Sequence, residues 1–380
     1  MVIAFAILLV VHGLIHLLGT ASAFGWAELP QLAQPISPFL GVLWLLSALL
    51  FLVAAVGLFI WPRTWWATGA AALVLSMVVI ASSWTDAKFG ALANALVLVG
   101  VGFGFLSQGP FSLRAEYDRD VAWRVLAPAT AMPVSEADLG HLPAPVQRYL
   151  RVVGVVGQPR VDNFRVRMHG RIRSGRDGRW MPLAAEQHNV VDPPARLFYM
   201  TASMMGIPAQ GYHRYVERAA TMRVRAAALV PVVTAGGRQM TRGETVTLFN
   251  DMCVMAPATL IEPAIVWEEV DARTVKARFT NAGHIISAAL SFNDAGELTN
   301  FVSDDRSQVL PDGTFRPLRW STPITRYRTY GAFHLPSGGE ARWHESDGAY
   351  AYIELTFDDV QYNVGASMAT RREEPSDVDR

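Results

Sequence analysis

The chain has 380 residues, of which 51% are hydrophobic, and its 33 basic and 33 acidic side chains leave no formal net charge. This length suggests two or three domains. The balanced charge argues against nucleic acid as a partner, because neutralising phosphates requires a basic excess. The single cysteine, Cys253, excludes an intrachain disulfide.

The charges are unevenly distributed along the chain. Residues 1–113 contain only four charged side chains, which are Glu28, Arg63, Asp86 and Lys88. A water-soluble surface needs many solvated groups, so this region does not suit a soluble fold. We expect it to lie in a membrane.

Four apolar stretches are long enough to cross a bilayer as helices, which takes about 20 residues each. They cover residues 2–24, 39–61, 65–84 and 89–106. Ala21-Ser22-Ala23 resembles a signal-peptide cleavage site, but no Lys or Arg precedes Arg63, so we favour a retained first helix. The sequence therefore predicts a transmembrane domain of about four helices over residues 1–108.

The arginines near the span ends predict an orientation. Arg63 lies between the second and third spans, and Arg114, Arg119 and Arg124 follow the fourth span. With four spans these positions share one side of the membrane, and Lys and Arg are enriched on the cytoplasmic side. We therefore expect an inner or plasma membrane protein whose C-terminal domain lies in the cytoplasm.

Two histidines interrupt the first span. His12 and His16 are four residues apart, so they lie on one face of the helix, and ionisable groups within a span are functional candidates. With Asp86 they form a candidate metal site. The alternative, which we favour, is that they pack and hydrogen-bond between helices. A haem suits this pair less well, because both histidines approach from the same face.

After the spans, the pattern changes to that of a β domain. Residues 109–160 form an amphipathic connector, in which we expect helices near 113–126 and 143–153. From Asn163, apolar and polar residues alternate as in a half-buried strand, and short strands recur to about residue 357. This pattern predicts an antiparallel β domain over residues 161–365, with a large curved sheet or partial barrel. A disordered tail, residues 366–380, completes the expected organisation.

One helix interrupts the strands. Thr241 and Glu244 match a capping box at its start, and Phe249 and Met252 fall on one face of the predicted helix, residues 241–256. We expect this helix to cover the open face of the sheet in an α+β arrangement.

Methionines are frequent around this helix, and methionine adapts to varied apolar ligands. Phe249, Met252, Met204 and Met222 are therefore candidate residues for binding a hydrophobic ligand. Ordinary filling of the core is the alternative role for these side chains.

Catalytic candidates are few. Glu186 and His188 share a strand face and form a candidate acid–base pair, although surface pairing is the favoured interpretation. The arginine-rich face of residues 165–173 suits either anionic lipid headgroups or solvent. No nucleophile, phosphate-loop or zinc-protease motif occurs in the sequence, so the catalytic residues stay unknown.

Several segments together resemble a known group of proteins. They are HGLIHLLG (12–19), SSWTDAKFGALAN (82–94), LPAPVQRYL (142–150) and AEQHNVVDPPARLFY (185–199). They resemble an uncharacterised bacterial family of four-helix integral membrane proteins with a C-terminal β domain, which brings no established activity. The meander with a covering helix is similar to the lipoprotein-carrier sheets that hold acyl chains. Such carriers usually lie outside the cytoplasm, in conflict with the orientation expected above.

Two functions follow as hypotheses. The first is a non-catalytic, membrane-anchored domain that binds a membrane lipid or another hydrophobic ligand. The alternative is a membrane metal or redox protein, or an enzyme, that uses His12 and His16. Neither hypothesis names a cofactor or a protein partner.

Overall fold

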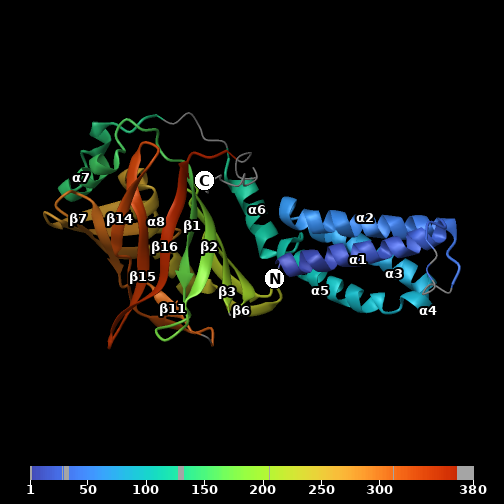
Figure 1. The fold of residues 1–380 in the computed structure, drawn as a ribbon. Helices are drawn as coiled ribbons and strands as arrows, with labels where there is room; N and C mark the ends of the chain where they lie inside the picture. Colours follow the sequence, from blue (N-terminus) through green and yellow to red (C-terminus); the bar gives the residue numbers. More distant parts are fainter. Residues whose placement is uncertain are drawn as a thin grey trace. The chain divides into compact units, whose positions relative to one another are not determined.

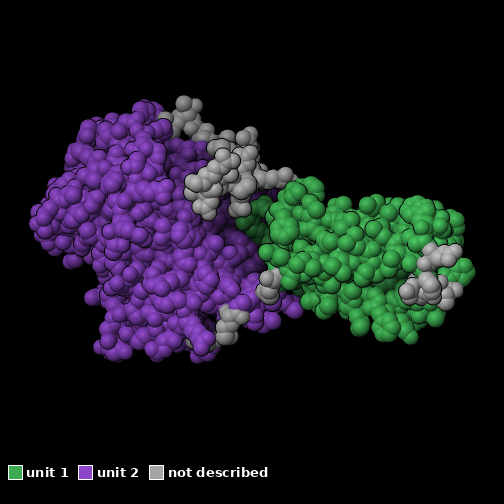
Figure 2. All heavy atoms as spheres, in the orientation of Figure 1, with its two compact units in different colours: residues 1–116 green, residues 117–380 purple. Residues whose placement is uncertain are grey.

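The computed structural model describes residues 2–27, 29, 34–126, 132–204, 206–310 and 312–365. The expected tail, residues 366–380, lies outside these ranges. The chain divides into two compact units, residues 1–116 and 117–380, which are coloured separately in Figure 2. Each unit is described by itself.

The first unit is helical. Its long helices are α1 (Val2–Ala23), α2 (Pro38–Ile60), α3 (Trp65–Ser82) and α5 (Gly90–Gln108), and the single-turn α4 (Trp84–Ala87) lies between the last two. Helix α2 begins with proline at its first position, and the hydroxyl of Ser37 accepts a hydrogen bond from the backbone of Leu40. Four helices of the described residues are long and apolar enough to cross a membrane, as expected.

Small residues allow these helices to pack closely. A side chain at Gly19 would collide with the ring of Trp44, and one at Gly104 would collide with Trp65. Large apolar side chains such as Ile3, Phe59 and Leu96 point outward and are exposed. Such a surface suits lipid tails, and the close approach of backbones at glycine is typical of membrane helices.

Short helices precede the sheet. Helix α6 (Leu113–Arg124) crosses the boundary between the two units, and the 3₁₀ turn η1 (Glu136–Leu139) and helix α7 (Ala144–Val153) follow it. The apolar face of α7 is buried, and Gly154, at φ 85°, ends it in the left-handed region that favours glycine. The hydroxyl of Tyr149 donates to the carbonyl oxygen of Cys253 at 2.8 Å, which ties α7 to the long helix α8.

Fourteen strands of the second unit form one antiparallel sheet (Figure 1). Their order is β6-β5-β4-β3-β2-β1-β16-β15-β13-β10-β9-β8-β7, and β14 pairs with β15. The first six are β1 (Asn163–Ile172), β2 (Met181–Val190), β3 (Ala195–Met204), β4 (Ile207–Val216), β5 (Ala219–Ala226) and β6 (Val230–Ala235). The second set begins with β7 (Ile265–Asp271), β8 (Thr274–Asn281), β9 (His284–Phe292) and β10 (Leu298–Ser303). It ends with β13 (Arg319–Ser321), β14 (Ile324–Tyr330), β15 (Phe333–Glu345) and β16 (Gly348–Tyr362), while β11 (Ser307–Val309) and β12 (Phe315–Pro317) form a separate pair.

The strand order explains the position of helix α8 (Gly237–Met255). This helix and the 3₁₀ turn η2 (Pro257–Ile261) connect β6 to β7, which are the two edge strands of the sheet. The chain must therefore pass from one edge of the curved sheet to the other, and α8 covers the concave face on the way. The sheet is open and is not a closed barrel, because β6 and β7 do not pair with each other. The expected curved sheet with a covering helix is confirmed.

The predicted start of α8 is wrong. The helix begins at Gly237, four residues before Thr241, and no capping box forms. The hydroxyl of Thr241 donates to the carbonyl oxygen of Gly237 at 2.9 Å, which is a bond inside the helix. Glu244 instead forms ion pairs with arginines of the sheet region. Thr241 and Glu244, whose spacing suggests a cap, therefore lie inside the helix, where Glu244 makes tertiary contacts.

Candidate functional site

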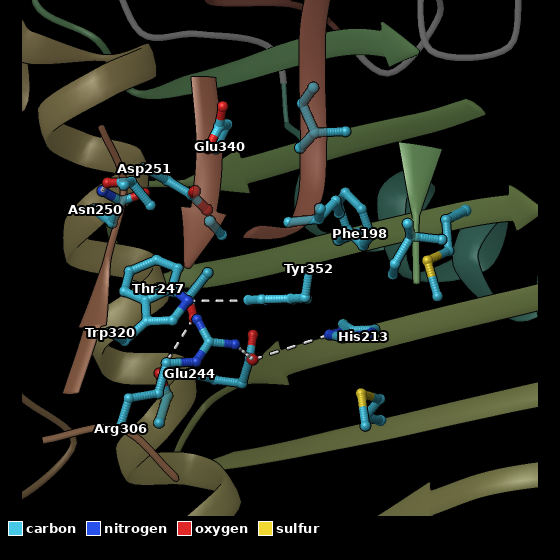
Figure 3. A pocket seen from close by; sticks show the side chains of 18 of the residues that line it. Phe198, His213, Glu244, Thr247, Asn250, Asp251, Arg306, Trp320, Glu340 and Tyr352 are labelled. Atoms are coloured by element: carbon cyan, nitrogen blue, oxygen red, sulfur yellow. Dashed lines mark hydrogen bonds and ion pairs between the residues drawn. The ribbon is translucent and has the colours of Figure 1, made fainter. Parts of the chain in front are cut away.

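A cavity of about 320 Å³ lies between α8 and the concave face of the sheet (Figure 3). Its walls are mainly apolar and come from strands on both halves of the sheet. Phe198 and Met200 come from β3, and Met222 and Val224 come from β5. Further apolar lining residues are Met168, Ile172, Val233, Met240, Val254, Met255, Trp320, Trp343, Tyr352, Leu355 and Phe357.

One side of the cavity carries a buried ion network. Arg196 on β3 donates through Nε to Asp251 at 2.6 Å and through Nη1 to Glu244 at 3.0 Å, and both carboxylates belong to α8. Its Nη2 also donates to Gln187 at 3.3 Å. Buried charges are stable only when they are paired and hydrogen-bonded. Arg196 therefore fastens α8 to the sheet at the border of the cavity.

A second arginine completes the network. Arg306 approaches Glu244 at 3.4 Å and donates to Thr247 at 2.5 Å, and its guanidinium lies over the ring of Trp320 at 4.5 Å. Burial by itself raises the pKa of Glu244, but the guanidinium of Arg196, with His213 and Arg306, holds that pKa well below its usual value. Glu244 is thus a carboxylate at neutral pH.

The carboxylate of Asp251 differs, because burial raises its pKa. Asp251 accepts hydrogen bonds from both Arg196, at 2.6 Å, and Gln187, at 2.7 Å. The polar side chains on this side of the cavity are therefore held in place by hydrogen bonds and ion pairs to one another. The apolar walls are free to contact a ligand. Such a site can hold an apolar chain and offer a few polar groups to one end of it.

The cavity reaches the surface near the β1–β2 turn and the start of α8. Among its lining residues, Ser174 and Gln239 are exposed, and Arg173 and Gln308 are half-buried. Arg173 donates to the backbone carbonyls of Ala351 and Arg176 and lies over the ring of Trp180 at 4.6 Å. The rim thus carries a cation, which suits an anionic group at the outer end of a ligand.

Of the four residues expected to contact a hydrophobic ligand, the structure places Met222 in the cavity wall. Phe249 is fully buried on another side of α8, where it stacks on Phe279 at 5.2 Å between ring centroids. Met252 is also buried, and Met204 is half-buried at the end of β3, but neither lines the cavity.

Sequence reasoning missed most of the cavity. The face of α8 that lines it is mostly small or polar, and it follows helical spacing: Met240, Gly243, Glu244, Thr247, Asn250, Asp251 and Val254. This stripe was a usable signal, because polar residues at steps of three and four on a buried helix need partners. The alternation of Phe198 with Met200 and of Met222 with Val224 indicated the matching faces of β3 and β5.

Of the three residues of the candidate metal site, the structure brings His12 and His16 together, with ring centroids 4.7 Å apart. His12 is hydrogen-bonded to Asn94 at 2.9 Å, and His16 is hydrogen-bonded to Ser76 at 2.8 Å. Asp86 instead accepts from the backbone of Gln34 at 2.9 Å. Within the described residues, no group of three His, Cys, Asp or Glu side chains suits a metal ion. The two histidines thus form part of a buried hydrogen-bond network between helices.

The other candidates have separate partners. Glu186 pairs with Arg165 at 2.9 Å, and His188 is buried and hydrogen-bonded to the hydroxyl of Tyr117 at 2.7 Å. The remaining arginines of β1 also meet carboxylates, since Arg167 pairs with Asp359 and Arg171 pairs with Glu354. These contacts describe an ion-paired outer sheet face.

Comparisons with known proteins place the chain in a family. No curated protein matches the sequence significantly. Among solved structures, the chain is similar to a domain assigned to outer membrane lipoprotein sorting, from Vibrio parahaemolyticus. That match has 11% identity and a TM-score of 0.32, and it covers 56% of this chain and 87% of the other. It is also similar to a DUF1329 family protein from Desulfovibrio piger, with 11% identity and a TM-score of 0.33, over 62% of this chain and 95% of the other.

The expected likeness to lipoprotein-carrier sheets is therefore found, at scores too low to say anything of a shared ligand. A family model matches residues 132–355, which include α8, the sheet up to the middle of β16 and every cavity-lining residue except Phe357. Since this match spans more than half of the chain, the protein belongs to the family of unknown function DUF6544.

Proposed function

We propose that the protein is a membrane-anchored, non-catalytic binder of a hydrophobic ligand, which it holds between α8 and the sheet. The observation that carries this proposal is the cavity of about 320 Å³ with mainly apolar walls. Its size falls at the lower end of the range of small-molecule sites. The apolar walls of an empty cavity lack packing partners, and an apolar ligand would supply them.

The ligand class is a membrane lipid or a related amphiphile with a single acyl chain. Each buried methylene contributes about 0.8 kcal/mol, so ten methylenes contribute about 8 kcal/mol before the costs of association. The cation of Arg173 at the rim suits an anionic or polar headgroup, and the apolar walls suit the chain.

The four apolar helices would supply the anchor. We further propose that the β unit lies in the cytoplasm, because Arg63, Arg114, Arg119 and Arg124 would then share the cytoplasmic side. A tethered domain samples ligands from its own membrane at a high effective concentration. Modest intrinsic affinity would therefore suffice for occupancy.

Photoaffinity labelling of the full chain in native membranes tests the proposal. Membranes are loaded with palmitic acid that carries a diazirine, irradiated, and digested for mass spectrometry. We expect labelled peptides from β3, β5 and α8. Met222→Asp places a carboxylate in the cavity wall and should reduce that labelling at least tenfold, since a buried unpaired charge excludes an apolar chain.

Met181→Asp is the matched control, because Met181 is another half-buried methionine of the sheet that does not line the cavity. It should leave the labelling of β3, β5 and α8 unchanged. Labelling confined to residues 2–108, or equal loss in both variants, would show that the cavity does not hold the chain.

A further inference from the structure

Two neighbouring hairpins end in an uncharged, apolar surface. The β3–β4 hairpin turns at Met204 and Ile207, and the β5–β6 hairpin contains residues 226–233, with the sequence AAALVPVV. The two turns lie together, because the backbone of Ala227 donates to the carbonyl oxygen of Pro208 at 2.7 Å. We call this surface the apolar tip.

Four large apolar side chains of the apolar tip are exposed. Leu229 is 63% exposed, Val230 55%, Val232 50% and Ile207 46%. Strand β6 is also an edge of the sheet, so its outer backbone groups are open to a partner. Soluble proteins usually protect such edges with charges, and an exposed apolar cluster marks an interaction surface.

The charges around the apolar tip indicate which partner it fits. Every charged residue from 218 to 243 is an arginine, and the nearest in sequence to the tip are Arg223 and Arg225 on β5. An uncharged apolar end flanked by cations matches the headgroup layer of a bilayer that contains anionic lipid. The β unit is also covalently joined to four apolar helices, so a bilayer is within its reach.

The other edge of the sheet provides a contrast. Strand β7 exposes Val266 and Val270 to a similar degree, at 56% and 49%. Their neighbours in sequence are Glu268, Glu269 and Asp271, which an anionic surface repels. Arg278 and Lys276 of the neighbouring strand β8 stand opposite Val266 and Glu268. Apolar exposure therefore occurs at both edges, but the charges beside β7 are of both signs, whereas those of residues 218–243 are all positive.

We propose that the apolar tip inserts into the headgroup layer of a lipid bilayer. The strands that carry it also line the cavity, since Met200, Val224 and Val233 lie a few residues from the turns. Insertion would therefore bring the cavity wall next to the membrane and give an acyl chain an apolar route along β3, β5 and β6. The insertion itself does not require that the cavity hold a ligand.

The single cysteine makes a site-specific test possible. Cys253 is fully buried, so a cysteine introduced at Leu229 is the accessible labelling site. The full chain, as Leu229→Cys with an environment-sensitive dye, is placed in nanodiscs of phosphatidylcholine and phosphatidylglycerol that contain nitroxide-labelled lipid. We expect a blue-shifted emission and strong quenching by the nitroxide, with weak quenching by aqueous iodide.

Val270→Cys, on the β7 edge, is the matched control and should show the opposite pattern. Val232→Asp, added to the Leu229 label, should abolish the nitroxide quenching, because a carboxylate is costly within a bilayer. Two results would overturn the proposal: iodide-dominated quenching at Leu229, or excimers between pyrene labels at Leu229 on two copies, which would make the tip a self-association edge. Both readouts are independent of ligand labelling in the cavity.

Discussion

Replacing Arg196 with Met removes the cation that joins α8 to the sheet. Met approximates the length of the arginine stem but cannot pair with Asp251 or Glu244, whose side chains are only 5% and 3% exposed. Breaking a buried ion pair by removing one partner costs about 3–5 kcal/mol. Because Arg196 serves two carboxylates, we expect a loss of about 4–5 kcal/mol, a large fraction of the stability of a typical domain.

Pulse proteolysis of the full chain across a urea gradient measures this loss. The midpoint for the β unit should fall by roughly 1–3 M urea. Arg319→Met is the matched control, because Arg319 pairs with Asp304 at the surface, where both side chains are more than half exposed. Its loss should stay below about 1 kcal/mol.

A double variant separates the ion network from simple packing. In Arg196→Met with Asp251→Asn, the remaining Glu244 and Arg306 form a balanced pair, so roughly 1–2 kcal/mol of the loss should be recovered. If Arg196→Met unfolds at the same urea concentration as Arg319→Met, or if Asp251→Asn recovers nothing, the network does not fasten α8.

Two further predictions concern pH and orientation. The pKa of Glu244 is lower in the folded than in the unfolded chain, so its ionised form stabilises the fold above the unfolded pKa, and this contribution is lost as the pH falls through the folded pKa. Between pH 7 and pH 3, the urea midpoint of Glu244→Gln should therefore fall less than that of the parent, and parallel decreases would refute the assignment. Two reporters fused after residue 365 test the orientation. A green fluorescent protein should fluoresce and an alkaline phosphatase should be inactive, because arginines at the span ends favour a cytoplasmic β unit. Active phosphatase would reverse the orientation.

The sequence by itself determined the division between apolar helices and the β domain. A bilayer requires about 20 apolar residues for each helix, so the four candidate spans are visible without tertiary information. Strand alternation from Asn163 is equally local, since one face of each strand is buried. The edge strand β6 (Val230–Ala235) carries no such signal, because its residues VPVVTA contain a proline and do not alternate, as edge strands allow.

Only the tertiary structure decided which faces of α8 meet which partners. The apolar face of α8 predicted that Phe249 would contact the ligand. However, nearly all faces of this helix are buried, so its apolar face did not reveal which face lines the cavity. That side carries Glu244 and Asp251 because Arg196, 48 and 55 residues away in sequence, meets them across the sheet. Such a network is stable only once β3 and α8 are brought together. The cavity likewise exists only because the strand order makes α8 cross from one sheet edge to the other, and this long-range pairing leaves no periodic signal in the chain.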